Sequence, residues 1–171
     1  REDEVFDFID VRGVEPHPAY RQFGMTRVSC RFCIMSSLAD LRAAACQPET
    51  HDLYRQMVDL ECRSTFAFQG ARWLGDIAPH LLDRDALPAL AAAKELARQR
   101  IEAERRITPP MLYVKGWPTR MLSDAEADRL ADARATVSGL LGLDARYLDR
   151  VAIHGRYAEL LAARTNRAKA A

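Results

Sequence analysis

Residues 84–106 constrain the fold of this chain most, because their sequence favours one long helix. The stretch is rich in alanine, and its larger apolar residues are leucine and isoleucine. These residues suit a helix, and Pro88 falls in the first turn, where proline is tolerated. The last turns, RQRIEAERR, interrupt arginine with glutamate, which indicates a solvated helix face rather than a nucleic-acid patch.

Helix start and stop signals divide the rest of the chain into further helices. Ser37 and Asp40 have the spacing of a helix cap, and Pro48 ends the helix that they begin. Ser123 and Glu126 form a capping box whose helix should reach Gly139 or Gly142. The remaining expected helices cover residues 3–13, 49–66 and 144–165, with a turn of helix at 19–23.

The segments between these helices are rich in turn-forming residues. The proline-rich stretch ITPPMLYVKGWPT cannot be helical, although MLYV (residues 111–114) could form a short strand. We therefore expect a mainly α fold with irregular connectors and at most one short strand. Residues 1–171 are expected to form a single helical module, with a cysteine-bearing segment at 1–82 and a helical C-terminal segment at 83–171.

Composition excludes several classes of protein. The chain has 171 residues, a net charge of +1 and 29% charged residues, which is a globular composition. No apolar run approaches the roughly 20 residues of a membrane span, so no membrane partner is expected. Four cysteines without an export signal indicate a reducing compartment, with the cytoplasm as the default. The eight glycines never cluster, so neither GxGxxG nor GxxxxGK[ST] occurs.

The four cysteines follow the pattern Cys30-x2-Cys33-x12-Cys46-x15-Cys62. Two cysteines three positions apart on a loop can direct both sulfur atoms at one ion, and four thiolates suit a [4Fe–4S] cluster. A zinc site made of Cys30, Cys33, Cys46 and His51 is an alternative. In a third interpretation no metal binds: Cys46 and Cys62 are small buried residues, and Cys30 and Cys33 have at most a redox role.

Two arginines flank the cysteine pair. Arg27 and Arg31 have an even spacing, which in an extended loop directs both guanidinium groups to the same side. Paired N–H donors of arginine suit phosphate or sulfate, although both residues could equally be solvated. His17 lies between two prolines that hold the chain extended, which suits either a ligand contact or a structural role.

The segment HPAYRQFGMTRVSCRFCIMSSLADLRAAA, residues 17–45, resembles the C-terminal part of proteins of the phosphoadenosine phosphosulfate (PAPS) reductase family. In those proteins an HP.Y..G..RvsC.fCi segment follows the nucleotide-binding half. The stretches LYRQMVDLE, FQGARWLGDIAP and RYAELLAAR are also similar, so the resemblance covers most of the chain. The family belongs to the adenine-nucleotide alpha-hydrolase superfamily, which implies that this chain is the helical C-terminal portion of an α/β protein.

The resemblance also implies ligands and partners. Family members bind ATP or PAPS through an S-G-G-K-D-S type loop, which this sequence lacks. The expected partner is therefore the nucleotide-binding half, in the same protein or in a partner chain. Assimilatory reductases carry a reducing cysteine in a C-terminal E-C-G-[IL]-H segment, whereas the tail LLAARTNRAKAA has none. Relatives that act in DNA phosphorothioation lack that tail and carry an iron–sulfur cluster, which favours sulfur transfer and adds DNA as a partner.

Two functions are expected from these observations. In the first, the chain and the missing half form an enzyme, an oxidoreductase or a sulfur or nucleotidyl transferase, that acts on an adenine (sulfo)nucleotide. Alone, the chain would be inactive. Cys30 and Cys33 would be the catalytic thiols or cluster ligands. The substrate contacts would be His17, Tyr20, Arg27 and Arg31. In the second, the chain is a non-catalytic helical interaction module, stabilised by an iron–sulfur cluster or zinc, that binds a partner protein or DNA.

Overall fold

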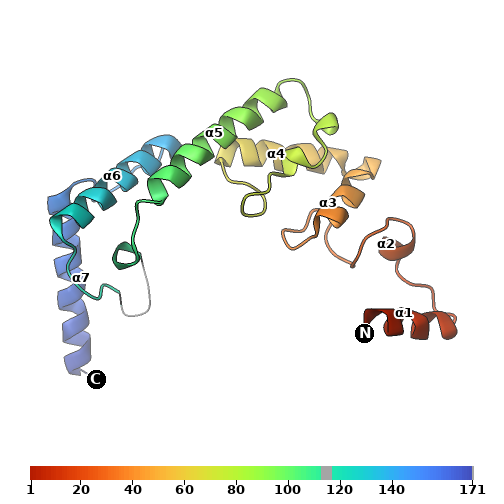
Figure 1. Ribbon diagram of the computed structural model, residues 1–171, viewed down its shortest axis with the longest axis horizontal. Coiled ribbons are helices and arrows are strands. Elements are labelled where there is room, and N and C mark those ends of the chain that lie inside the picture. Colours follow the sequence, from red (N-terminus) through yellow and green to blue (C-terminus); the bar gives the residue numbers. More distant parts are fainter. Residues whose placement is uncertain (113–116, 171) are drawn as a thin grey trace. The chain divides into compact units, whose positions relative to one another are not determined.

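The computed structural model describes residues 1–112 and 117–170 and is mainly helical, as the sequence predicts (Figure 1). Within these ranges there is no strand, and one isolated bridge joins Gln69 and Arg72. The α-helices are α1 (Glu2–Val11), α2 (Pro18–Arg21), α3 (Leu38–Ala45), α4 (His51–Ser64), α5 (Ala86–Glu104), α6 (Asp124–Leu141) and α7 (Arg150–Ala170). Short 3-10 turns are η1 (Pro48–Thr50), η2 (Leu74–Asp76), η3 (Pro79–Leu81) and η4 (Pro109–Met111).

Local capping chemistry accounts for where several helices begin. The Ser37 hydroxyl accepts the Asp40 N–H at 3.1 Å, and the Ser123 hydroxyl accepts the Glu126 N–H at 3.3 Å, so both predicted helix starts are confirmed. The helix that Ser123 begins ends at Leu141, where Gly142 takes a φ of +63°.

Several expected element boundaries differ from the structure. The helix expected at 49–66 begins only at His51, because Pro48 first forms the turn η1. The last helix begins at Arg150 instead of 144, after irregular backbone that includes Tyr147 at a φ of +60°, and it reaches Ala170 instead of 165. Of the possible strand at 111–114, Met111 belongs to η4, and residues 113 and 114 lie outside the described residues.

The chain divides into two compact units, unit 1 (Arg1–Ala93) and unit 2 (Lys94–Ala171). The expectation of one module over 1–171, with segments at 1–82 and 83–171, stays a prediction. None of the described helices is both long and apolar enough to cross a membrane.

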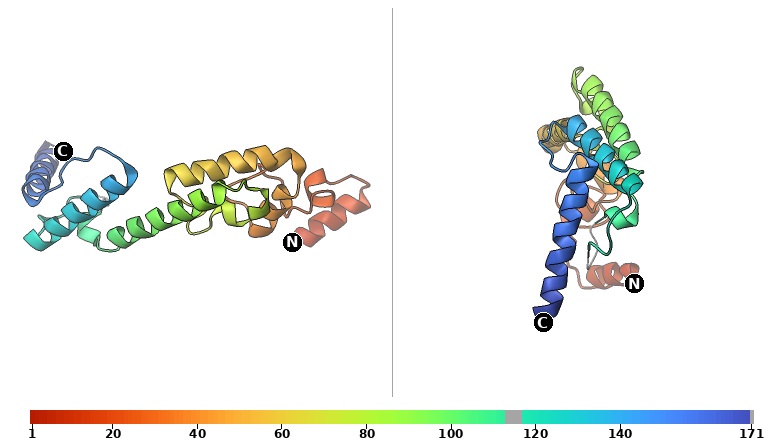
Figure 2. Two further views of the ribbon diagram at one scale, coloured as in Figure 1. Left: turned by 90° about the horizontal axis from the view of Figure 1, so that it is seen from above. Right: turned by 90° about the vertical axis from the view of Figure 1, so that its left-hand side faces the viewer.

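In unit 1, α4 forms the centre of a hydrophobic core. Tyr54 and Val58 point from this helix onto Leu41 of α3 and Leu74 of η2, and all four side chains are buried. Figure 2 shows α4 alongside the part of α5 that belongs to this unit. The Tyr54 hydroxyl donates to the Leu74 carbonyl at 2.7 Å, and burial raises the pKa of this phenol to about 12. Tyr54 therefore anchors the connector after α4 as well as filling the core.

A buried carboxylate organises the same connector. Glu61, on the inner face of α4, accepts the N–H groups of Phe68 at 2.7 Å, Leu74 at 2.7 Å and Gly75 at 3.0 Å. A carboxylate has no donor of its own, so it can accept several backbone N–H groups at once. This residue holds the chain between α4 and α5 in one conformation.

Unit 2 is built on the packing of α6 against α7. Ala127 and Ala131 of α6 and Ile153 and Tyr157 of α7 are buried in its core. At one end of the pair, Arg150 donates to Asp124 at 2.9 Å and also pairs with Asp128. The small alanine side chains allow the two helices to approach closely.

Candidate functional site

Residues 26–36, here called the cysteine loop, are anchored by Asp40. This carboxylate is buried and accepts the Thr26 N–H at 2.6 Å, the Thr26 hydroxyl at 2.9 Å and the Ser37 hydroxyl at 2.9 Å. Burial alone would raise the pKa of Asp40, but the hydrogen bonds from the Thr26 backbone and the two hydroxyl groups outweigh it and lower that pKa. Asp40 therefore holds the loop as a carboxylate.

Two further contacts fix the other end of the cysteine loop. The Gln69 side chain donates to the carbonyls of Ile34 at 2.6 Å and Ser36 at 2.8 Å. Phe32, between the two cysteines, is buried in the core with its ring centroid 5.6 Å from that of Tyr54. The cysteines are thus carried on a loop of defined conformation.

The two cysteines of this loop differ in environment. Cys33 is half-buried, and its sulfur accepts the Met35 N–H at 3.4 Å and an Arg27 N–H at 3.7 Å. Cys30 is exposed. N–H···S hydrogen bonds of this kind are made to the sulfur ligands of iron–sulfur clusters, where they tune the reduction potential.

The predicted metal ligands are not gathered into one site. None of the four cysteines forms a disulfide, and no group of three or more His, Cys, Asp or Glu side chains within residues 1–112 and 117–170 is arranged to hold a metal ion. Cys62 packs against the unit 1 core, whereas Cys46 is exposed, so the alternative in which Cys46 is a buried core residue is wrong. His51 directs its Nε2 at the Ala45 carbonyl, 3.1 Å away. The [4Fe–4S] and zinc sites stay predictions.

A cavity of about 320 Å³ opens beside the cysteine loop, and two of the predicted substrate contacts line it together. We call it the His17 cavity. It lies between α2, the cysteine loop and η1, and its lining includes His17, Phe23, Val28, Ser29 and Arg31.

Polar groups of the His17 cavity are oriented by their own hydrogen bonds. The His17 Nδ1 accepts the Ala19 N–H at 3.1 Å, so in the neutral imidazole the proton is on Nε2, which is then a donor. Arg31 donates to the Glu49 carbonyl at 3.3 Å and is exposed. The Ser29 hydroxyl donates to the Cys30 carbonyl at 3.3 Å, and Glu49 also lines the cavity. The His17 and Arg31 donors beside apolar side chains suit an oxyanion attached to an organic group.

The other predicted contacts lie elsewhere. Tyr20 packs edge-on against Phe6 of α1, with ring centroids 5.0 Å apart. Arg27 contacts the sulfur of Cys33. Neither of these residues, nor Cys30 or Cys33, is among the residues that line the His17 cavity. The structure thus brings two of the four predicted substrate contacts into one cavity.

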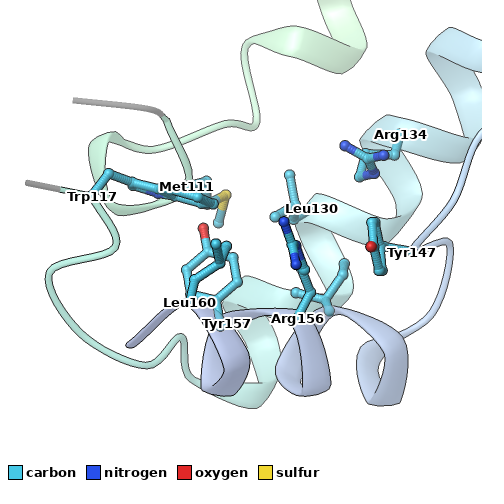
Figure 3. Close-up of a pocket in the computed structure, with 9 residues that line it drawn as sticks. Met111, Trp117, Leu130, Arg134, Tyr147, Arg156, Tyr157 and Leu160 are labelled. Atoms are coloured by element: carbon cyan, nitrogen blue, oxygen red, sulfur yellow. The ribbon is translucent and has the colours of Figure 1, made fainter. Parts of the chain in front are cut away.

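Sequence reasoning missed a second cavity, in unit 2 (Figure 3). We call it the aromatic cavity, after Trp117, Tyr147 and Tyr157, which line it together with Arg134 and Arg156. The sequence indicates only that Trp117 is a packed corner. The sequence spacing could have indicated which of these residues share a helix face. Leu130 and Arg134 are four positions apart on α6. On α7, Arg156, Tyr157 and Leu160 follow Ile153 by three, four and seven positions.

The chain matches no protein-family model, no curated protein and no solved structure. The resemblance of residues 17–45 to PAPS reductases therefore stays a prediction. What this molecule can do has to be inferred from the geometry of the cysteine loop and of the two cavities.

Proposed function

We propose that this chain is the C-terminal part of a PAPS-reductase-like protein that acts on an adenine (sulfo)nucleotide in sulfur-transfer or redox chemistry. One observation carries the proposal. His17 and Arg31, two of the residues that the resemblance implies as substrate contacts, line the same 320 Å³ cavity. The cavity offers donors for a sulfate or phosphate group and apolar side chains for the rest of the ligand.

The cysteine loop supports a chemical role in the same unit. Ser29 of the His17 cavity is adjacent in sequence to Cys30, so the loop that lines the cavity also carries the thiols. Cys30 and Cys33 are the proposed reactive groups, with Arg27 donating to the Cys33 sulfur. Cysteines that form no disulfide fit a reducing compartment, and we place the protein in the cytoplasm.

The proposed active form needs the nucleotide-binding half, from the same protein or a partner chain, to supply the phosphate-binding loop. Exposed apolar side chains on the cysteine loop favour such a partner. Ile34 is 62% exposed and Met35 73% exposed, although Gln69 fixes the backbone there. The same observation favours the second candidate, a non-catalytic module that binds a partner protein or DNA through this loop.

Calorimetric titration with PAPS and with ATP, under reducing conditions, tests the nucleotide proposal. Because the S-G-G-K-D-S loop is absent, we expect weak binding of PAPS and no turnover. The Arg31→Gln variant should bind PAPS about tenfold more weakly, since it loses one charge-assisted contact to the oxyanion. The matched control is Arg42→Gln, which removes an exposed arginine of α3 outside the cavity lining and should bind like the wild type.

Equal affinity of wild type and Arg31→Gln, or no binding at all, would argue against a nucleotide site and for the interaction module. Iron and zinc analysis after anaerobic purification tests the metal separately. About four irons per chain in the wild type, and a loss of iron in Cys30→Ser, would support the cluster. Protein without either metal would assign the cysteines to thiol chemistry alone.

A further inference from the structure

The aromatic cavity of unit 2 has the size and lining of a small-molecule site. Its volume is about 350 Å³, within the range of roughly 300–1,000 Å³ that is typical of such sites. Figure 3 shows Arg156 and Tyr157 projecting from α7, Leu130 and Arg134 from α6, and Trp117 on the opposite side. All of these residues belong to unit 2, so the cavity is complete within it.

The aromatic side chains present rings that are already held in place. Trp117 and Tyr157 pack edge-to-face, with ring centroids 5.1 Å apart. The Tyr157 hydroxyl donates to the Pro110 carbonyl at 3.2 Å, which fixes the orientation of this ring. A flat aromatic ligand gains both apolar burial and ring–ring contacts in such surroundings.

The charge of the cavity lining is positive. Arg134 and Arg156 are among its nine described residues, and none of the nine is acidic. Arg134 is already committed: its Nε and Nη2 donate to the Arg146 carbonyl at 3.1 and 2.7 Å, and its guanidinium lies over the Tyr147 ring. This leaves Arg156 as the residue whose guanidinium can bind an anionic ligand.

Arg156 has a partner that a ligand can replace. Its Nη1 donates to Glu159 one turn along α7 at 3.0 Å, and the two side chains are 43% and 68% exposed. Exposed ion pairs within one helix contribute little to stability, so a carboxylate in the cavity can take the place of Glu159. In Figure 3 the Arg156 side chain extends toward Leu130, into the cavity. One available guanidinium suits one planar, singly charged group.

We propose that the aromatic cavity binds a planar aromatic carboxylate, with its ring packed against the Trp117–Tyr157 pair and its carboxylate on Arg156. This site is independent of the nucleotide site proposed in unit 1. The ligand is defined here by its chemistry, an aromatic ring with one acidic group.

Naphthoate is a suitable probe, with cyclohexanecarboxylate and naphthylmethanol as the non-aromatic and uncharged analogues. We expect calorimetry to detect naphthoate binding to the full chain, and each analogue to bind about tenfold more weakly. In ¹H–¹⁵N spectra, naphthoate should shift the indole signal of Trp117, identified by its loss in Trp117→Phe, and leave the Trp73 signal in place.

The Arg156→Gln variant should bind naphthoate about tenfold more weakly than the wild type. Arg105→Gln is the matched control, because Arg105, directly after α5 in unit 2, also pairs with a glutamate three positions away and is exposed. It should bind like the wild type, and circular dichroism should show both variants folded. The proposal is overturned if naphthoate does not bind the wild type, or if it binds without moving the Trp117 signal. It is also overturned if naphthoate binds Arg156→Gln as tightly as the wild type, or if either analogue binds the wild type as tightly as naphthoate does.

Discussion

Glu61 is the single residue on which the connector of unit 1 most depends. Replacing it by glutamine keeps the size of the side chain but turns one acceptor oxygen into an NH₂ donor, which then faces backbone N–H groups. We expect Glu61→Gln to lower the free energy of unfolding by roughly 2–4 kcal/mol. Urea unfolding followed by the fluorescence of Trp73, which is buried in the same unit, measures this change.

The matched control is Asp59→Asn, two positions earlier on α4. Asp59 pairs with Arg63 at 2.8 Å, and both side chains are largely exposed. Its removal should change the free energy of unfolding by less than about 1 kcal/mol. If Glu61→Gln cost no more than this control, the buried carboxylate would not be what orders the connector.

Asp40 predicts a specific dependence of stability on pH. Its folded pKa lies below the ordinary value of 3.8, so the folded state binds the proton less readily than the unfolded state. The stabilisation is fully present above 3.8 and is lost as the pH falls through the lower folded pKa. Unfolding of Asp40→Asn, measured between about pH 5 and pH 2, should therefore depend less on pH than that of the wild type. If the free energy of unfolding changed with pH by the same amount in Asp40→Asn and in the wild type, this prediction would be contradicted.

Among single residues, His17 could be expected at a ligand site from the two prolines that flank it and from the family-like segment, and Arg31 from its place beside the cysteine pair. Tyr20 lies in the same segment but packs on Phe6, a contact that depends on how α1 folds back. Arg156 stands in the sequence as the first residue of the family-like stretch RYAELLAAR, but that stretch does not indicate a cavity. Its importance comes from the ring of Trp117, which reaches the same cavity from a distant part of the chain.

At the scale of elements, the helix starts were predictable because capping is local. The hydroxyl groups of Ser37 and Ser123 satisfy N–H groups only three positions away, so the sequence contains the whole interaction. The connectors were not predictable, because their partners are distant. The chain after α4 is held by Glu61, and nothing in the sequence around Phe68 indicates that a glutamate seven positions earlier accepts its N–H.

The contact of η2 with α5 depends on a glycine. A Cβ atom at Gly75 would lie 2.5 Å from Leu90 Cδ2 and 3.2 Å from Val58 Cγ1. We expect Gly75→Ala to destabilise the protein by roughly 1–3 kcal/mol and Leu90→Ala by roughly 2–5 kcal/mol. The double variant should cost clearly less than the sum, because alanine at position 90 leaves room for the new methyl group. Additive costs in urea unfolding would exclude this steric contact.

At a second glycine, replacement by alanine should raise the stability of the protein instead of lowering it. Gly155 is exposed in the interior of α7, and a Cβ atom there would meet nothing within 4 Å. Gly155→Ala should stabilise unit 2 by about 0.5–1 kcal/mol, because alanine loses less backbone entropy in a helix. Ala158→Gly, on an exposed position of the same helix, is the control and should destabilise by a similar amount. Thermal unfolding measures both changes: the midpoint should rise for Gly155→Ala and fall for Ala158→Gly.

At the scale of the whole molecule, the mainly helical class followed from periodicity and caps, but the division into units did not. The sequence from 84 to 106 reads as one uninterrupted helix, and α5 is indeed continuous from Ala86 to Glu104. The boundary between the units falls inside this helix, at Ala93 and Lys94. Helix propensity does not indicate this boundary, because the division into units arises from the two separate cores that the flanking segments form.

These two cores predict two unfolding transitions. Leu41 is fully buried in the core of unit 1 and Ile153 is buried in that of unit 2, and replacing either by alanine should cost roughly 2–5 kcal/mol. Trp73 reports on unit 1 and Trp117 on unit 2, so Trp117→Phe and Trp73→Phe backgrounds follow the units separately. Leu41→Ala should lower only the Trp73 midpoint and Ile153→Ala only the Trp117 midpoint. If either variant moved both midpoints equally, the chain would unfold as one cooperative module, as its sequence alone predicts.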